Sequence, residues 1–511
     1  MGTNGTLTEI IEIGIALSAE KNLDRLLALI LNKSMDLSCS DGGSLYLLQE
    51  DGLHFKLAYN RSVPITFHEV VLPVTPASIA GYAALSGKPL LLEDAYRIPQ
   101  SAPYAFNHSF DESHGYRTRS MVAIPMKTHK GESIGVLQLI NRKRNIAVRL
   151  TSTAAARRDI ITFAPDTVRL LEALASLAGV AIENSRLYQA IEALFEGFVR
   201  ASVKAIEQRD PATSGHALRV SILTLAMAEA VHRASAGPYA AVSFDEATLR
   251  ELKYAGLLHD FGKVAVREEV LGKAKKLHAG EMERVRWKIL YHKKNIQFQA
   301  MQRRFRASGA GELPAIDAWE AEELARAEEI RRTVERADEP NVLPEGDFRA
   351  LQGIRDVPFE PPEGGVQPLL TERELHALSL RKGTLDEAER LEVESHVIHS
   401  FNFLCQIPWT QDLSAIPEIA HAHHEKINGR GYPLGLTGTQ IPLQAKLMAI
   451  ADIFDALSAC DRPYKKAVPV ERALEILKAE AREGLLDPGL VDLFIENRIW
   501  EKTMHLRLTA V

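Results

Sequence analysis

The sequence predicts a multidomain protein with an α/β domain over residues 1–165, a long connecting helix over 166–209 and an all-α domain over 210–511. Three observations predict this order. The first range contains two β-hairpin patterns. No proline interrupts the second range, and from about Ala201 to the C-terminus apolar residues recur almost entirely at helical spacing.

The first domain is expected to mix helices with paired strands. Apolar residues at helical spacing predict one helix from Leu7 to about Leu37. An Asp51-Gly52 turn separates two strand-like runs and predicts a hairpin. A second hairpin is expected around Lys130-Gly131-Glu132, between Met121–Met126 and Ser133–Asn141.

This order of helix, strand pairs and closing helix resembles a GAF domain, a common cytosolic ligand-sensing module. The run Val136–Arg142, near the last expected strand, adds to the resemblance. The resemblance implies an unknown small ligand for this domain. Asn141-Arg142 also match the start of the cyclic-nucleotide signature of that family, but Phe163 and Asp166 are not spaced as the signature requires. A cyclic nucleotide is therefore the less favoured ligand.

The predicted connecting helix carries apolar residues at alternating spacings of four and three. This is the a/d pattern of a coiled coil, with Asn184 as a polar position that could set the register. The pattern favours a parallel homodimer, and the alternative is a helix packed along its own domains. The residues of the pattern are Leu170, Leu174, Leu177, Ala181, Asn184, Tyr188, Ile191, Phe195 and Phe198.

An irregular segment from about 288 to 381 interrupts the helical domain. It contains a charged helix candidate, Asp317–Ala337, and a stretch rich in proline and glycine, Pro358–Pro368. The sequences that flank it resemble one another, which indicates an insertion. Its role is expected to be either a solvated spacer or a cover over the active site.

Two motifs in the helical domain bring together side chains that bind metals. His259 and Asp260 are adjacent, and His423-His424 precedes a Gly429–Pro433 turn. Imidazole and carboxylate groups suit divalent transition metals. Lys263 follows one turn after His259, where it could contact a phosphate.

Further candidates are weaker by themselves. His216 opens an expected helix, and a lone histidine there is by default structural. Asp452 lies in an apolar helix, where a buried acid needs a partner such as a metal, and Asp455 competes for that role one turn later. His396 and His292 compete for the position of a third histidine.

Together the motifs resemble those of the HD-GYP family of metal-dependent cyclic dinucleotide phosphodiesterases. The resemblance implies a first metal held by His216, His259, Asp260 and Asp452. It implies that Asp260 bridges to a second metal held by His396, His423 and His424. Iron or manganese is implied for both sites, and Ala212 stands where members with a third metal have Glu.

The same resemblance implies hydrolysis of cyclic di-GMP, with Asp260 and Lys263 as catalytic residues. Lys263, Tyr432, Arg462 and Lys465 are the implied substrate contacts. A non-catalytic cyclic di-GMP receptor and an HD-type nucleotide phosphohydrolase are the alternatives. A mixed cyclic GMP-AMP substrate also remains open.

Composition limits the classes of partner. A net charge of −6 weighs against duplex nucleic acid, which usually meets a basic face. Three widely separated cysteines give no disulfide framework, which fits a reducing cytoplasm. No apolar run is long enough to span a bilayer, and the first residues lack the pattern of a secretory leader, so we expect a cytoplasmic protein without a membrane partner.

Overall fold

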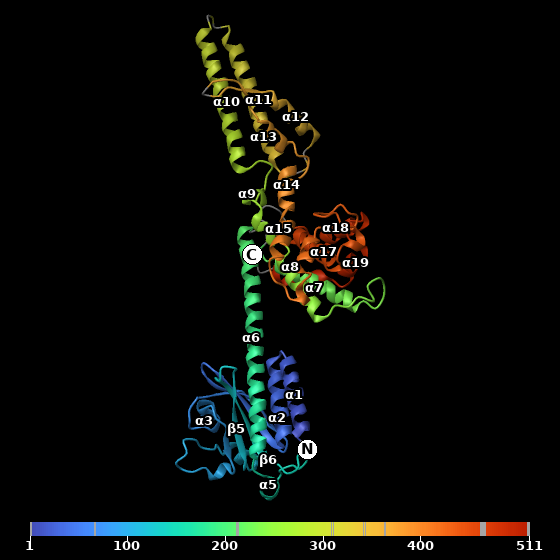
Figure 1. Cartoon of the computed structure of the whole chain (residues 1–511). Coiled ribbons are helices and arrows are strands. Elements are labelled where there is room, and N and C mark those ends of the chain that lie inside the picture. Colours follow the sequence, from blue (N-terminus) through green and yellow to red (C-terminus); the bar gives the residue numbers. More distant parts are fainter. Residues whose placement is uncertain are drawn as a thin grey trace. The chain divides into compact units, whose positions relative to one another are not determined.

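A computed structural model describes residues 3–65, 68–210, 214–307, 309, 311–340, 342, 344–361, 364–459 and 467–507. The chain divides into two compact units, residues 1–196 and 197–511. The predicted fold class is confirmed, because the first unit is α/β and the second is largely helical (Figure 1).

The first unit is built on a six-stranded antiparallel sheet in the order β3-β2-β1-β6-β5-β4. Both expected hairpins are present: Leu48 pairs with Leu53 in the first, and Ile124 pairs with Leu137 in the second. The strands are β1 (Ser40–Gln49), β2 (Gly52–Asn60), β3 (Val70–Leu72), β4 (Leu90–Leu92), β5 (Met121–Lys127) and β6 (Ser133–Arg142).

The helix expected from Leu7 to Leu37 is wrong as one element, because the chain forms two helices there. The side chain of Asn22 accepts a hydrogen bond from the Arg25 N–H and so caps the start of the second helix. The helices of this unit are α1 (Thr3–Ala19), α2 (Leu23–Ser38), α3 (Ile79–Ser86), η1 (Ala95–Arg97), α4 (Ser109–His114), α5 (Thr153–Asp159) and the start of α6 (Pro165–Arg209).

The first half of α6 belongs to the core of the first unit. Its residues Leu174, Ala178 and Ile182 are fully buried and pack with α2 and one face of the sheet. The other face of the sheet packs against α3, through residues such as Ile79 and Ala83. The burial of Leu174 and Ala181 removes two positions of the expected coiled-coil pattern from the surface.

The second unit, outside its insertion, consists of helices and 3-10 turns among the residues that the structure describes. In its core, α7 packs against both α8 and α17. The elements are α7 (His216–Arg233), α8 (Glu246–Leu258), η3 (Phe261–Ala265), α9 (Glu268–Leu271), α15 (His396–Leu404), η4 (Gln411–Leu413), α16 (Ile416–His421), η5 (Gly438–Gln440), α17 (Leu443–Ser458), α18 (Val470–Arg482), α19 (Pro488–Glu496), η6 (Ile499–Thr503) and α20 (Met504–Arg507).

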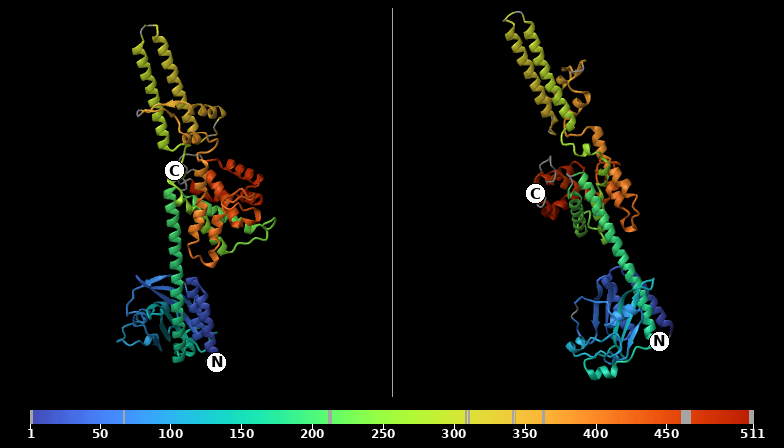
Figure 2. Two further views of the ribbon diagram at one scale, coloured as in Figure 1. Left: turned by 45° about the horizontal axis from the view of Figure 1, so that its top comes forward. Right: turned by 90° about the vertical axis from the view of Figure 1, so that its left-hand side faces the viewer.

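The insertion has a hydrophobic core of its own, whose buried residues run from Leu277 to Leu378. Lys288 lies within a continuous helix, so the structural boundary falls near Leu277 and not at 288. Figures 1 and 2 show α10 and α11 side by side as a long hairpin. The elements are α10 (Ala279–Arg306), α11 (Leu313–Asp338), α12 (Glu345–Arg355), β7 (Pro358–Phe359), β8 (Gln367–Pro368) and α13 (Glu372–Leu378), after which α14 (Glu387–Glu394) leads into α15.

Across the described residues, no helix combines the length and the apolar character needed to cross a membrane.

Candidate metal centre

The second unit gathers the seven metal ligands expected from the sequence. His216, His259 and Asp260 form one group whose ligand atoms lie within 4.8 Å of one another. His396, His423 and His424 form a second group of the same compactness. Asp452 contacts both groups, with 3.1 Å from its Oδ1 to His216 Nε2 and 3.8 Å from its Oδ2 to His424 Nδ1.

Three of the histidines are oriented in the same way. Each lies where a helix ends or begins, and its Nδ1 donates to the carbonyl three residues earlier: His259 to Gly256 (2.8 Å), His423 to Ala420 (2.6 Å) and His396 to Val393. Carbonyls at a helix end lack helical partners, so they are free to accept such a bond. The bond fixes the tautomer and leaves Nε2 with a lone pair.

Those three Nε2 atoms provide a test of whether a metal fits. All three are buried and make no hydrogen bond among the described residues. An imidazole nitrogen left in this state costs about 1–3 kcal/mol, unless a metal or water satisfies it. The donor set of nitrogen and oxygen atoms, together with the three unsatisfied nitrogens, fits divalent transition metals.

Asp260 lies between the two groups. Its Oδ1 is 3.2 Å from His396 Nε2, and its Oδ2 is 3.4 Å from His259 Nε2. Burial alone would raise the pKa of Asp260, but the Lys263 ammonium and the neighbouring His259 and His396 rings outweigh it and hold that pKa well below the usual value. The carboxylate therefore stays ionised, as a bridging ligand must.

Lys263 contacts this carboxylate directly. Its Nζ is 2.8 Å from Asp260 Oδ2 and 3.6 Å from an oxygen of Asp210. Burial opposes its charge, yet the attraction of the two carboxylates prevails and raises the pKa of Lys263. The structure thus places a cation beside the expected bridge.

His216 is held by an acid that faces away from the centre. Its Nδ1 lies 2.9 Å from Asp455 Oδ2, and Arg219 Nε donates to the other oxygen of Asp455 at 2.9 Å. Burial lowers the pKa of His216, but Asp452 and Asp455 together raise it to about 9. Of the two competing acids, Asp452 therefore faces the candidate ligands, whereas Asp455 orients one of them.

His423 and His424 are in the form that binds metals. Burial and the neighbouring imidazoles hold the pKa of His423 well below its usual value. Burial also lowers the pKa of His424 to about 3. Both rings are therefore neutral at neutral pH, with a lone pair available.

The turn after these histidines is shaped by Glu425. Its carboxylate is buried and accepts the backbone N–H groups of Leu434 (2.7 Å) and Leu436 (2.9 Å). Gly431 passes so close to this residue that a Cβ would lie 2.4 Å from Glu425 Cα, which only glycine allows. The next residue, Tyr432, stacks its ring 4.8 Å from that of His424.

Ser400 and a pair of phenylalanine rings connect the His259–Asp260 segment to α15. Ser400 is fully buried, donates to the His259 carbonyl (2.7 Å) and accepts from the Gly262 N–H (2.8 Å). The rings of Phe261 and Phe403 stack 3.8 Å apart beside it. The first residue of α15 is His396, so these contacts hold the two ligand groups together.

The structure also gives the local setting of the other candidates. His423 and His424 lie in the turn that follows α16, and His396 begins α15. His292 lies on α10 in the insertion and is in neither ligand group. Ala212, Arg462 and Lys465 lie outside the described residues.

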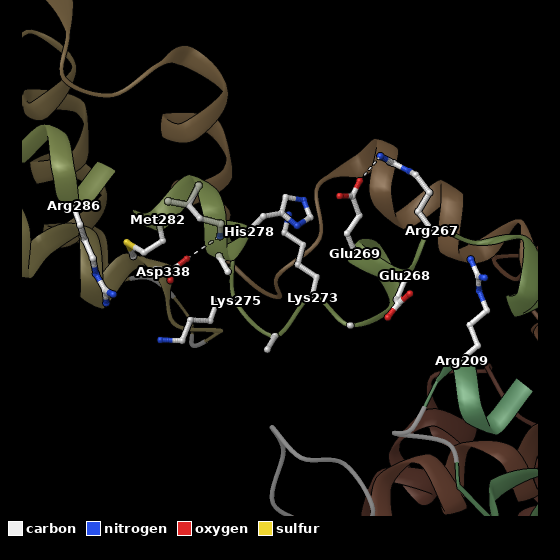
Figure 3. A pocket seen from close by; sticks show the side chains of 14 residues that line it. Arg209, Arg267, Glu268, Glu269, Lys273, Lys275, His278, Met282, Arg286 and Asp338 are labelled. Atoms are coloured by element: carbon white, nitrogen blue, oxygen red, sulfur yellow. Dashed lines mark hydrogen bonds and ion pairs between the residues drawn. The ribbon is translucent and has the colours of Figure 1, made fainter. Parts of the chain in front are cut away.

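A cavity of about 1060 Å³ lies away from these ligands, at the base of the insertion. Figure 3 shows its charged lining, in which Glu269 points toward Arg267. Three of its cations have acidic partners: Arg267 pairs with Glu392, Lys273 with Glu389 and Lys275 with Glu339. Arg209 donates to the Val266 carbonyl. The cavity therefore offers little unpaired charge for a phosphate ligand, and it lacks the buried, unsatisfied imidazole nitrogens of the histidine cluster.

Comparison with known proteins agrees with this division of the chain. A family model described as GAF domain matches residues 22–182, and one described as HD domain matches residues 372–490. The chain thus contains a GAF domain and an HD domain. The HD match includes His396, His423, His424 and Asp452, whereas His216, His259 and Asp260 precede it.

Three curated relatives match parts of the chain. A 3'3'-cGAMP-specific phosphodiesterase 3 of Vibrio cholerae is 39% identical over 22% of this chain and 24% of its own length. A probable cyclic di-GMP phosphodiesterase of the same organism is 47% identical over 16% of this chain and 18% of its own length. The cyclic di-GMP phosphodiesterase response regulator RpfG of Xanthomonas campestris is 49% identical over 16% of this chain and 21% of its own length. Each match thus spans a quarter or less of the relative.

Proposed function

We propose that this chain, with its GAF and HD domains, is a metal-dependent cyclic dinucleotide phosphodiesterase of the HD-GYP type, with cyclic di-GMP as substrate. The observation that carries the proposal is the pair of ligand groups joined by Asp260, with three buried Nε2 atoms that make no hydrogen bond among the described residues. The activities for which the relatives are named support the substrate class.

The centre would hold two divalent metals. His216, His259, Asp260 and Asp452 would bind the first, and His396, His423 and His424 the second, with Asp260 shared. Nitrogen and oxygen ligands without thiolate suit iron or manganese. Such a metal pair, when bound, stabilises phosphoryl charge and lowers the pKa of water.

The remaining residues would bind and orient the dinucleotide. Lys263, a partly buried cation 2.8 Å from Asp260, would stabilise charge that develops on the phosphate. Tyr432, which packs on His424, would contact the substrate at the mouth of the centre. Arg462 and Lys465 would add phosphate contacts, with Arg462 offering a bidentate fork.

The experiment that tests the proposal starts from protein purified without oxygen. Elemental analysis should find about two iron or manganese ions per chain. Incubation with cyclic di-GMP should then yield the linear dinucleotide or GMP, and 3'3'-cGAMP serves as the competing substrate. Metal-loaded protein that binds cyclic di-GMP without cleaving it would favour a receptor, and cleavage of nucleoside monophosphates alone would favour a nucleotide phosphohydrolase.

We also propose that α6 pairs two copies of the chain. Apolar side chains on α6 that stay exposed in one copy support this: Leu177, Leu187, Tyr188, Ile191 and Leu194 are 38–75% exposed. Glutamate at Leu177 and Ile191 should weaken the dimer in sedimentation experiments. A monomer of the unchanged protein at micromolar concentration would refute the pairing.

A further inference from the structure

The outer face of α10 in the insertion carries a row of exposed apolar side chains. Trp287 is 63% exposed, Leu290 46%, Phe298 51%, Met301 56% and Phe305 91%. At about 100° per residue these side chains fall within about 80° of one another around the helix. We call this set the α10 stripe.

The stripe is not the face that packs in the hairpin. Val285, Ile289, Ile296 and Ala300 are buried against the rest of the insertion and lie on the opposite side of the helix. α10 is therefore apolar on two faces, and only one has a partner among the described residues. An exposed row of this length, about 27 Å from Trp287 to Phe305, marks an interaction surface.

The spacing along the stripe indicates what kind of partner fits. Positions 287, 291, 294, 298, 301 and 305 follow one another at intervals of four and three. This is the seam of a coiled coil, in which a second helix packs along the first. Tyr291 is part-buried against Phe359, and the other five positions are exposed. The polar Lys294 in the middle of the seam is the type of residue that restricts the register and the orientation of the pair.

We propose that the α10 stripe is a contact between two copies of this chain, with the two α10 helices antiparallel. In a parallel pair Lys294 would face its own copy, and two ammonium groups would repel each other. In the antiparallel pair Lys294 meets Phe298 of the second copy, where its stem packs on the ring and its charge lies over the aromatic face. Trp287 then meets Phe305.

The area involved is consistent with such a contact. A large apolar side chain has roughly 150–200 Å² to bury. At the observed exposures, the five stripe residues would remove about 500 Å² per copy from water, and so about 1,000 Å² for the pair. This reaches the lower limit for a specific protein interface, and the α10 contact does not depend on the α6 contact.

An anionic lipid surface fits the stripe less well. Three basic residues of α10 are used within the hairpin: Arg286 pairs with Glu335, Lys293 with Glu328 and Arg304 with Asp317. Arg303 lies over the Trp319 ring of α11. In the C-terminal half of α10, uncharged amide side chains lie near the stripe: Asn295, Gln297, Gln299 and Gln302. Amides pair well across a protein contact, whereas a membrane-bound helix draws on unpaired cations.

Disulfide crosslinking of the full-length chain tests both the contact and its direction. In a background with Cys39, Cys405 and Cys460 replaced by serine, Lys294→Cys and Phe298→Cys are prepared separately. On mild oxidation the mixture should give at least fivefold more crosslinked dimer than either variant alone, since a disulfide needs neighbouring Cβ atoms. Val366→Cys, an exposed position of the same insertion, mixed with Lys294→Cys is the matched control.

Crosslinking of the mixture at the control level would overturn the proposal, and equal crosslinking of each variant alone would overturn the antiparallel direction. Unchanged metal content and circular dichroism establish that the variants fold. Co-sedimentation of the unchanged protein with vesicles of phosphatidylcholine and phosphatidylglycerol, lost on Phe298→Glu, would instead assign the stripe to a lipid surface.

Discussion

Gly262→Ala should disable the metal centre without unfolding the protein. A Cβ at this position would lie 1.9 Å from the His396 carbonyl oxygen and 2.4 Å from the Ser400 backbone nitrogen. Real Cβ contacts essentially never fall below 3.0 Å, so η3 and α15 must separate by about 3.0 − 1.9 = 1.1 Å. Both atoms belong to backbone, so no side-chain rotation can relieve the clash.

The separation of η3 from α15 would displace Asp260, the expected bridging ligand. Asp260 lies two residues before Gly262, and its Oδ1 is 3.2 Å from His396 Nε2. A shift of about 1 Å in catalytic geometry costs on the order of 100-fold in rate, and disturbing the support of a ligand lowers metal affinity by about 10- to 100-fold. Overpacking costs about 1–3 kcal/mol of stability, which a domain of ordinary stability survives.

The assay compares metal content, turnover of cyclic di-GMP and circular dichroism with those of Gly280→Ala. Gly280 lies in the first turn of α10, and nothing lies within 4 Å of the place that an added methyl group would take. The same substitution there should therefore leave all three readouts unchanged. Gly262→Ala protein that keeps two metals and turnover within threefold of the unchanged protein would refute the reasoning.

Four further substitutions address the ligands and the residues that compete with or orient them. Asp260→Ala should remove metal from both sites and abolish turnover, because one carboxylate serves both groups; near-normal metal content by elemental analysis would contradict the bridge. His396→Ala should lower metal content toward one ion per chain and largely abolish turnover, while His292→Ala on α10 should change neither, and the reverse result would move the third histidine into the insertion. Asp455→Asn should weaken metal binding by about 10- to 100-fold in a chelator competition, because His216 loses the carboxylate that orients it; unchanged competition would show that Arg219 and packing hold the ring without it.

Part of the site could be predicted from local sequence and part could not. The pairs His259-Asp260 and His423-His424 are adjacent in the chain, so a motif displays them directly. The supports of these residues are distant: Ser400 lies 138 residues from Gly262, and Asp455 lies 239 from His216. An acid in an apolar helix indicates that a partner exists but not which one, so Asp452 and Asp455 could be separated only by the direction in which each faces.

The fold, too, could be predicted only where the signal lies in the local sequence. Periodicity predicted both hairpins and the helical character of the second unit. It missed the interruption at Asn22, although an Asn followed by Leu-Asp is a recognisable helix start. It also assigned Leu174 and Ala181 to an exposed seam, because a heptad pattern does not distinguish a partner helix from the helix's own domain.

The base of the insertion has a consequence for how the chain can fold. Lys276 is fully buried, and its Nζ donates to the carbonyl of Leu380, 104 residues later, at 2.6 Å. Closing a flexible loop of that length costs about 2.5 kcal/mol more than closing one of about six residues, at (3/2)RT per logarithmic unit of length. Since the insertion has its own core, it can form first and bring Lys276 and Leu380 together as neighbours. The segments that carry Asp260 and His396 are then joined by a short connection. The loop-closure cost of bringing them together is that of a short turn and not of a loop of about a hundred residues.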